Sequence, residues 1–176
     1  MVGSLVGVLL NLDAAAFHWV LAHRWAPLDF PMIALSHAGA WVWVGLGALL
    51  ALAFRRSGAF AGAYQSAIAV GLAALVANIA AKPFVGRQRP YLVFTDIHVI
   101  ASLPRSASFP SGHAAASFAG AYALSRVFPE LKVPLWLLAC LVAFSRVYVG
   151  VHFPMDVIAG ALVGLAAAAF VVAPSR

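Results

Sequence analysis

The stretch Ser145-Arg-Val-Tyr-Val-Gly-Val-His-Phe-Pro-Met-Asp156 interrupts the apolar C-terminal part of the chain. It places an arginine, a histidine and an aspartate within eleven residues, although polar groups cost free energy in a hydrocarbon environment. Apolar runs lie on both sides of it. The stretch therefore separates two expected membrane helices and marks the candidate functional site.

The composition of the whole chain is that of a membrane protein. Of 176 residues, 64% are hydrophobic and 9% are charged, whereas soluble domains have about 25% charged and 45–50% apolar residues. Apolar runs of about 20 residues match a hydrocarbon core about 30 Å thick. The sequence predicts an all-α, polytopic membrane bundle, and its length allows one domain over residues 1–176.

The net charge of +6 does not indicate a nucleic-acid partner. The basic residues are few and lie at the ends of apolar runs, where membrane topology and anionic lipid headgroups explain them. The single cysteine, Cys140, excludes an intrachain disulfide. The N-terminus lacks a basic region and a cleavage site, so we expect no removable signal peptide.

Five apolar runs are expected to cross the membrane, and they cover residues 30–54, 59–81, 112–128, 133–148 and 154–173. Pro27 and Pro31 mark a break before the first run. Residues 11–25 mix aromatic and polar side chains, which predicts an N-terminal interfacial helix that Asn11 or Asp13 caps. The alternative is a sixth span over residues 2–22 with both of these polar groups buried. Gly160 and Gly164 are spaced for close helix packing.

Alternating spans place most of the candidate site residues on one membrane face. These residues are Lys82, His113, Arg146, His152 and Asp156. The opposite face receives Arg55, Arg56, Arg126, Lys132 and Arg176. Because positively charged connections stay in the cytoplasm, we expect the site to face the periplasm or the cell exterior, in a cell membrane of bacterial type.

The first motif, Lys82 to Pro90, begins the one long polar connection of the chain, residues 82–112. Lys82 and Arg89 offer a point charge and a planar pair of donors to phosphate oxygens. The alternative is a basic anchor at the membrane interface.

The second motif is Pro110-Ser-Gly-His113. Ser111 suits the N-cap of a helix, and Gly112 lets a ligand approach the backbone, where free N–H groups and the helix dipole favour an anion. His113 then projects beside that anion. The alternative is an ordinary capped helix with an incidental histidine.

The third motif is the stretch from Ser145 to Asp156, in which Arg146 can bind phosphate. His152 and Asp156 lie four residues apart and share a helix face, so the carboxylate can fix the imidazole tautomer. The alternative is a hydrogen bond that only satisfies two polar groups. A metal site needs at least three protein ligands, and the surrounding cations favour an oxyanion over a metal ion.

Together, these three motifs resemble the signature of the type-2 phosphatidic acid phosphatase superfamily. The resemblance implies hydrolysis of a phosphate ester or diphosphate without metal or other cofactor, through a phosphohistidine. It implies that His152 is the nucleophile, that Asp156 orients it and that His113 protonates the leaving oxygen. The implied phosphate-binding residues are Lys82, Arg89, Ser111, Gly112 and Arg146.

Within the superfamily, the segments 106–113 and 144–156 look most like bacterial undecaprenyl pyrophosphate phosphatases of the bacitracin-resistance type. Gly112 departs from that pattern, since some of those enzymes have aspartate there. The resemblance implies a membrane lipid substrate, undecaprenyl pyrophosphate first. Phosphatidylglycerol phosphate, phosphatidic acid and lipid A 1-phosphate are alternatives within the same mechanism. A vanadate-dependent haloperoxidase and a non-catalytic lipid-binding or transport protein are alternatives from other classes.

Overall fold

The computed structural model describes residues 2–55 and 57–172, and every regular element in these ranges is a helix. The long helices are α1 (Val2–Ala22), α3 (Ala40–Phe54), α4 (Ala59–Leu75), α7 (Gly112–Val127), α8 (Lys132–Tyr148) and α9 (Pro154–Val171). The short elements are α2 (Ala26–Ser36), the π-helical η1 (Val76–Ala81), α5 (Lys82–Val85), α6 (Pro90–Val93) and the 3₁₀ turn η2 (Pro129–Leu131). The prediction of an all-α fold is confirmed.

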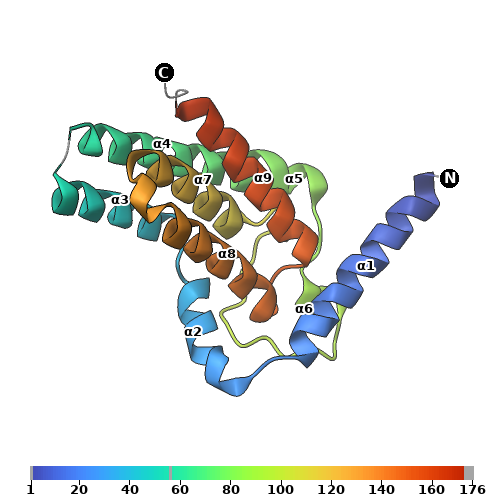
Figure 1. Ribbon diagram of the computed structural model, residues 1–176. Coiled ribbons are helices and arrows are strands. Elements are labelled where there is room, and N and C mark those ends of the chain that lie inside the picture. The colour runs from blue at the N-terminus through green and yellow to red at the C-terminus, as the bar shows by residue number, and fades with distance from the viewer. Residues whose placement is uncertain (1, 56, 173–176) are drawn as a thin grey trace.

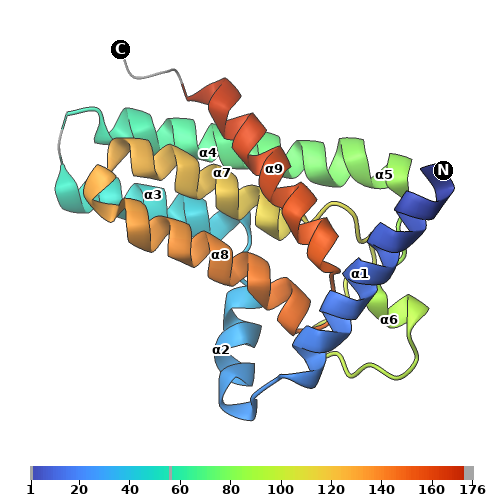
Figure 2. The ribbon, with the colours of Figure 1, turned by 45° about the vertical axis from the view of Figure 1, so that its right-hand side comes forward.

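Helix α7 lies in the middle of the bundle, where α3, α4, α8 and α9 pack around it (Figures 1 and 2). The expected close packing at the glycines of α9 is confirmed. A Cβ atom at Gly160 would lie 2.3 Å from the carbonyl oxygen of Ser111, and one at Gly164 would lie 2.2 Å from that of Ala115. Because the two backbones touch, α9 holds the start of α7 in a fixed position.

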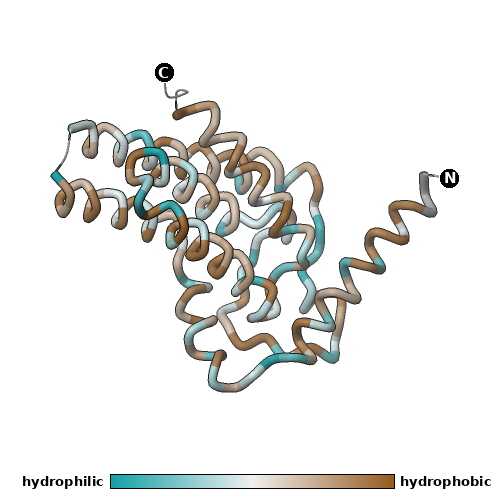
Figure 3. The backbone as a smooth tube through the Cα atoms, viewed as in Figure 1, coloured by the Kyte–Doolittle hydropathy of each residue, from teal (hydrophilic) through white to brown (hydrophobic). Residues whose placement is uncertain are grey.

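The outer surface of the bundle is apolar, as it must be in contact with lipid. Trp41, Phe84 and Phe170 are 85%, 89% and 87% exposed. Hydrophilic positions gather in the connections, and the helices are mainly hydrophobic (Figure 3). Four helices in the described ranges are long and apolar enough to cross a membrane, or five if the bent pair α2–α3 crosses as one span.

The run over residues 30–54 is not one straight helix. It divides into α2 and α3, which are bent by 78° with respect to each other. The expected break at the prolines is wrong, because Pro27 lies in the first turn of α2, where a missing N–H costs nothing, and Pro31 lies inside the helix. The chain bends instead at 37–39, beside the candidate site.

The N-terminal residues form a single helix, which favours the second of the two alternatives for this region. Helix α1 includes an apolar window, Leu5–Ala22, that is long enough to span a membrane. Neither polar residue caps a helix: Asp13 is buried and Asn11 is exposed on the same helix. The second half of α1 meets α8 and α9, whereas its first half stands apart from the bundle (Figures 1 and 2).

Candidate active site

A polar pocket of about 230 Å³ lies between the α2–α3 bend, the η1–α5 segment and the adjoining ends of α7 and α8. Its walls include six of the eight predicted site residues, namely Lys82, Arg89, Gly112, His113, Arg146 and His152. The remaining two, Ser111 and Asp156, lie behind this wall and hold it. The structure thus brings together the residues that alternating spans place on one membrane face.

Lys82 reaches the pocket because helix α4 changes register just before it. The buried positions of α4 and η1 recur every three or four residues, and they include Gly62, Ser66, Ala69, Ala73 and Ala77. The next buried position is Lys82, five residues later, after the π-helical segment. Its Nζ donates to Asn78 Oδ1 at 2.7 Å and to Ser106 Oγ at 3.2 Å.

Arg89 is buried and is held by the 82–112 connection. Its Nε donates to the carbonyl oxygen of Ser106 at 2.7 Å, and its Nη2 donates to that of Ala107 at 3.2 Å. Nη1 donates to the carbonyl oxygen of Val151 at 2.8 Å and lies 3.2 Å from His152 Nε2. The guanidinium is therefore placed beside one nitrogen of the imidazole ring.

The second motif opens α7 as predicted. Ser111 is the N-cap, and its Oγ accepts from Ala114 N at 3.4 Å. The N–H of Ser111 also donates to the carbonyl oxygen of Asp156 at 2.8 Å, which joins the second motif to the third. His113 faces the α2–α3 bend, where a Cβ at Gly39 would lie 3.7 Å from its Nε2.

Arg146 sits near the C-terminal end of α8 and is buried. Its Nη1 donates to both the carbonyl oxygen and the hydroxyl of Ser36, which closes α2. Its buried Nε has no hydrogen-bond partner among the residues that the structure describes. A buried donor without a partner is costly, and an anion in the pocket would satisfy it.

His152 and Asp156 are both buried and form the predicted pair. Nδ1 of the imidazole lies 3.5 Å from Asp156 Oδ2. Ser108 bridges the two, with its Oγ 3.4 Å from Nδ1 and 2.5 Å from Oδ2. Because arginine can only donate, Arg89 requires a lone pair on Nε2, and the ring proton must then lie on Nδ1, facing Asp156 and Ser108. This tautomer leaves Nε2 able to attack an electrophile.

His152 lies in the connection between α8 and α9, and its surroundings favour the neutral ring. Burial, with a smaller contribution from the Arg89 and Arg146 guanidinium groups, lowers the pKa of His152 to about 4, although Asp156 opposes the shift. The imidazole is therefore uncharged at neutral pH, which a nucleophilic nitrogen requires.

Asp156 has a second, charged partner that sequence reasoning left without a role. Arg87 Nη1 lies 2.8 Å from Asp156 Oδ1, and Arg87 Nη2 lies 2.6 Å from Asp13 Oδ2. The backbone N–H of Phe153 donates to Asp156 Oδ2 at 2.9 Å. Arg87 thus supports the His152–Asp156 pair and does not line the polar pocket.

Several other supporting residues were missed from the sequence. They are Asp13, Ser36, Asn78, Ser106 and Ser108, in addition to Arg87. Asn78 offered a usable signal, because it is an amide four residues before Lys82 within an apolar run. The serines offered none, since serine is ordinary in a polar connection.

The site has the chemistry of an anion pocket. Lys82, Arg89 and Arg146 supply positive charge around His113 and His152. Within the described residues, no group of three or more histidine, cysteine or acidic side chains is placed to hold a metal ion. The donors and the neutral imidazole suit an oxyanion such as phosphate.

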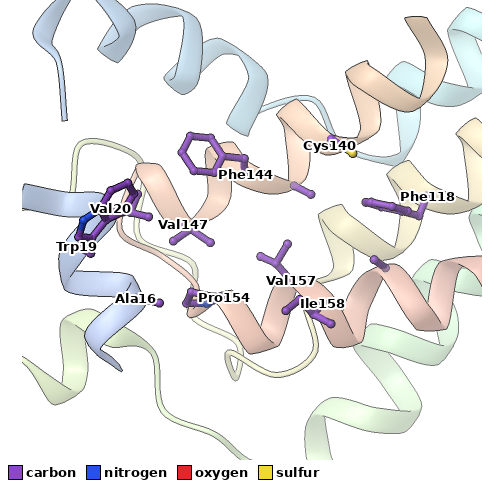
Figure 4. A pocket seen from close by; sticks show the side chains of 12 residues that line it. Ala16, Trp19, Val20, Phe118, Cys140, Phe144, Val147, Pro154, Val157 and Ile158 are labelled. Carbon is purple, nitrogen blue, oxygen red and sulfur yellow. The ribbon is translucent and has the colours of Figure 1, made fainter. Parts of the chain in front are cut away.

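An apolar groove of about 570 Å³ lies on the lipid side, between α8 and α9. Figure 4 shows Phe118 of α7 and Cys140 toward one end of the groove, and Trp19 and Val20 of α1 toward the other. Val147 and Pro154, which also line it, are chain neighbours of Arg146 and of the His152–Asp156 segment. The groove is therefore lined in part by the segments that carry candidate site residues.

This fold and site define a helical membrane phosphatase: a bundle with an apolar exterior and, at one end, a cationic pocket with a histidine backed by a carboxylate. The model of the PAP2 superfamily matches residues 62–174, which include all three motifs. The chain belongs to the PAP2 superfamily, as the resemblance of its motifs predicted.

Comparison with curated proteins gives relatives of moderate identity. The chain is 32% identical over 160 residues to an undecaprenyl-diphosphatase of Sulfolobus acidocaldarius, across 88% of this chain and 74% of that protein. It is 39% identical over 132 residues to a decaprenylphosphoryl-5-phosphoribose phosphatase of Mycolicibacterium smegmatis, across 71% and 64% of the two chains. It is 33% identical over 97 residues to the undecaprenyl-diphosphatase BcrC of Bacillus subtilis, across 54% and 49%.

Solved structures share the fold. LpxE of Aquifex aeolicus superposes with a TM-score of 0.79 at 28% identity, over 91% of this chain and 94% of that one. A PAP2-type phosphatidylglycerolphosphate phosphatase of Bacillus subtilis superposes with a TM-score of 0.71 at 26% identity, over 93% and 84%. This chain is therefore a multi-pass membrane protein of the PAP2 type.

Proposed function

We propose that this protein hydrolyses undecaprenyl pyrophosphate to undecaprenyl phosphate and inorganic phosphate. The observation that carries the phosphatase chemistry is the placement of His152, with Nε2 turned to the cationic pocket and Nδ1 turned to Asp156. The choice of substrate is supported by the similarity to the Sulfolobus acidocaldarius undecaprenyl-diphosphatase, of which the chain covers 74%.

In the proposed reaction, His152 Nε2 attacks the terminal phosphorus. His113 takes up a proton when the anionic diphosphate binds beside it. The bond between this phosphorus and the bridging oxygen breaks, and His113 donates that proton to the oxygen as undecaprenyl phosphate leaves. Water then attacks the phosphohistidine, gives up a proton to His113 and releases inorganic phosphate. Asp156 stabilises the charge that develops on the ring, and the covalent intermediate divides one difficult step into two.

The phosphate oxygens are bound by fixed donors around the pocket. Lys82, Arg89 and Arg146 stabilise the charge on the transferring group. Gly112 presents its backbone N–H at the first turn of α7, and Ser111, whose own N–H donates to Asp156, caps that turn. Three cations suit a diphosphate, which carries more charge than a monoester. In phosphoryl transfer, such positioning and charge stabilisation provide most of the catalysis.

We also propose that the apolar groove between α8 and α9 receives part of the prenyl chain. Its lining is almost wholly apolar, and it includes Val147 and Pro154, which are chain neighbours of candidate site residues. A chain lying there would keep its contact with the bilayer while the diphosphate meets the pocket.

The proposed orientation turns the site away from the cytoplasm. Among the described residues, Arg55, Arg126 and Lys132 follow α3, end α7 and begin α8, opposite the pocket; Arg56 and Arg176 lie outside the described residues. At the pocket end, Arg87 is paired with two carboxylates, so it adds little net charge. The positive-inside rule then supports a periplasmic or external site in a cell membrane. We therefore expect a C-terminal fusion to a reporter that works only in the cytoplasm to be active, and a fusion to a reporter that works only outside it to be inactive.

A competition assay tests the function. Purified protein in chelator is given undecaprenyl pyrophosphate, phosphatidylglycerol phosphate, phosphatidic acid and a lipid A 1-phosphate, each alone and then mixed. We expect the highest kcat/KM for the prenyl pyrophosphate and no turnover by His152→Ala. A higher kcat/KM for another lipid would reassign the substrate, and no phosphate release from any of them would indicate a non-catalytic lipid-binding protein.

A further inference from the structure

The arrangement of Arg87 between two carboxylates points to an active site that includes the N-terminal helix. We propose that Asp13 of α1 and Arg87 are positioning residues that hold the carboxylate of Asp156 against His152. This inference rests on the proposed phosphatase function, since it concerns the group that orients the nucleophile. It also reaches beyond the part of the chain that the PAP2 model matches, because α1 lies before residue 62.

The first line of support is how the guanidinium is used. Nη1 contacts Asp156 at 2.8 Å and Nη2 contacts Asp13 at 2.6 Å, so its two outer nitrogens serve two different acids. Its Cζ atom lies 4.0 Å from the centre of the Phe153 ring, which fixes the plane of the group. Both carboxylate side chains are fully buried, while that of Arg87 is 19% exposed.

A second contact ties Asp13 to the same point. Its Oδ1 accepts from the backbone N–H of Met155 at 2.8 Å, in the first turn of α9. Asp13 therefore reaches Asp156 by two routes, through Arg87 and through the adjacent peptide. One turn further along α1, Phe17 packs against Phe153 with ring centres 5.3 Å apart. These contacts fix the α8–α9 connection from the lipid side.

The free-energy balance favours a functional reason for these charges. Burying ion pairs generally gives little net stability, and apolar side chains of similar size hold two helices together equally well or better. Losing one partner, however, leaves a charge buried without compensation, which is strongly destabilising. A helix that only needed an anchor would not require Asp13 at a buried position of a membrane span.

The arrangement gives His152 a defined electrostatic setting. The charged groups that act on it are Asp156, Arg89 and Arg146 in its own surroundings, with His113 across the pocket and Arg87 and Asp13 behind Asp156. Asp13 takes up part of the positive charge of Arg87, so Arg87 does not draw Asp156 away from the ring. Removing Asp13 and removing Arg87 should therefore shift the pKa of the His152 imidazole in opposite directions.

The test compares Asp13→Asn, Arg87→Gln and the double variant with Asp96→Asn. Asp96 is an exposed aspartate in the 82–112 connection, so its variant removes an equal charge without changing the contacts among Asp13, Arg87 and Asp156. We expect kcat to fall about 10- to 100-fold in each single variant, with KM little changed, because a displaced catalytic group is penalised in the transition state. The double variant should lose no more than the worse single variant, and Asp13→Glu should recover part of kcat.

The imidazole itself gives a readout that a purely structural role would not move. In ¹⁵N-histidine NMR spectra, the pKa of His152 should fall in Asp13→Asn and rise in Arg87→Gln. Thermal melting gives the fraction of folded protein, to which kcat is normalised. If Asp13→Asn does not fold, Arg87→Lys replaces it in the test, because lysine keeps the charge but lacks the two donor nitrogens that contact both acids. The inference is overturned if these variants have the wild-type kcat per folded molecule, or if the pKa of His152 does not change in them. Neither result affects the proposed function, which an inactive wild-type protein would overturn.

Discussion

The guanidinium of Arg89 stands against the imidazole of His152, with Nη1 and Nε2 3.2 Å apart. A group that can only donate thus occupies the lone pair that the proposed reaction uses, so the resting enzyme keeps this nitrogen unprotonated. When a phosphate enters, the same donor is in place to bind one of its oxygens. The two residues form one unit, which selects the tautomer before binding and stabilises charge afterwards.

Arg89→Lys tests this unit. An ammonium group keeps the charge but cannot donate to Val151, Ser106 and the imidazole at the same time, because it lacks the planar fork of arginine. We expect kcat/KM for the lipid substrate to fall about 10²-fold or more. Steady-state phosphate release measures it. Wild-type activity in this variant would show that charge alone is sufficient at residue 89.

The protonation of His152 can be followed directly. With its pKa lowered to about 4 by burial and by Arg89 and Arg146, the ring should stay neutral in ¹⁵N-histidine NMR spectra recorded at pH 5.5. His152→Gln, which removes this signal, gives the assignment. A ring that titrates near 6.5, the ordinary value, would contradict the prediction.

The same shift has a consequence for stability. An unfolded chain has the ordinary histidine pKa of about 6.5 and binds the proton more readily than the folded chain between that value and about 4. The neutral ring therefore contributes its full stabilisation, about 3 kcal/mol at most, above pH 6.5, and this is lost as the pH falls toward 4. On acidification, His152→Gln should lose less Tm than the wild type.

His113→Ala tests the proton donor. Removing a general acid should lower kcat about 10²- to 10⁴-fold when the leaving group is a poor one, such as a lipid alcohol. The loss should be smaller for substrates with good leaving groups, namely a pyrophosphate, whose leaving group is a phosphate, and a nitrophenyl phosphate. Rates over this series give the measurement, and an equal loss across it would count against the acid role.

The backbone of Gly112 lies against the side chain of Asn78, which leaves no room for a Cβ atom at residue 112. A Cβ at Gly112 would lie 2.8 Å from Asn78 Oδ1, the atom that accepts from Lys82. Gly112→Ala should therefore displace Asn78 and lower kcat/KM about 10-fold or more, and adding Asn78→Ala should restore part of it. Gly71→Ala is the control, since that position on α4 has nothing within 4 Å. Failure of the double variant to recover would place the defect elsewhere.

The apolar groove is tested by filling it. Ala161→Trp puts an indole into the groove between α8 and α9 and should raise KM for the long-chain lipid several-fold, while a short-chain, water-soluble phosphate keeps its KM. Ala166→Trp, at an exposed position of the same helix, is the matched control. An equal effect of both variants on both substrates would argue against chain binding at this place.

Local signals in the sequence predicted the elements that local chemistry determines. The start of α7 follows from the cap at Ser111, and that of α9 from Pro154 in its first turn, so both helices begin where expected. The site residues followed from three motifs at the ends of apolar runs. Their meeting in one pocket followed from the alternation of spans.

Features that depend on contacts between distant residues were not predictable. The bend between α2 and α3 falls at residues 37–39, and the local sequence Ser36-His37-Ala38-Gly39 does not show that Gly39 will lie beside His113. Asp13 finds Arg87 at a separation of 74 residues, and nothing near Asp13 indicates this partner. Ser36 is likewise recognisable only once Arg146 lies beside it.

The π-helical segment before Lys82 amounts to one extra residue in the helix. Without it, the inward face of α4 would continue to residues 80 and 81, both alanines, and the lysine would turn toward lipid. The direction of the lysine side chain thus depends on the helical register of the residues that precede its motif. A relative with the full motif but with one residue fewer in this span would fold as a similar bundle and present an incomplete pocket, so the motif alone does not identify a working phosphatase.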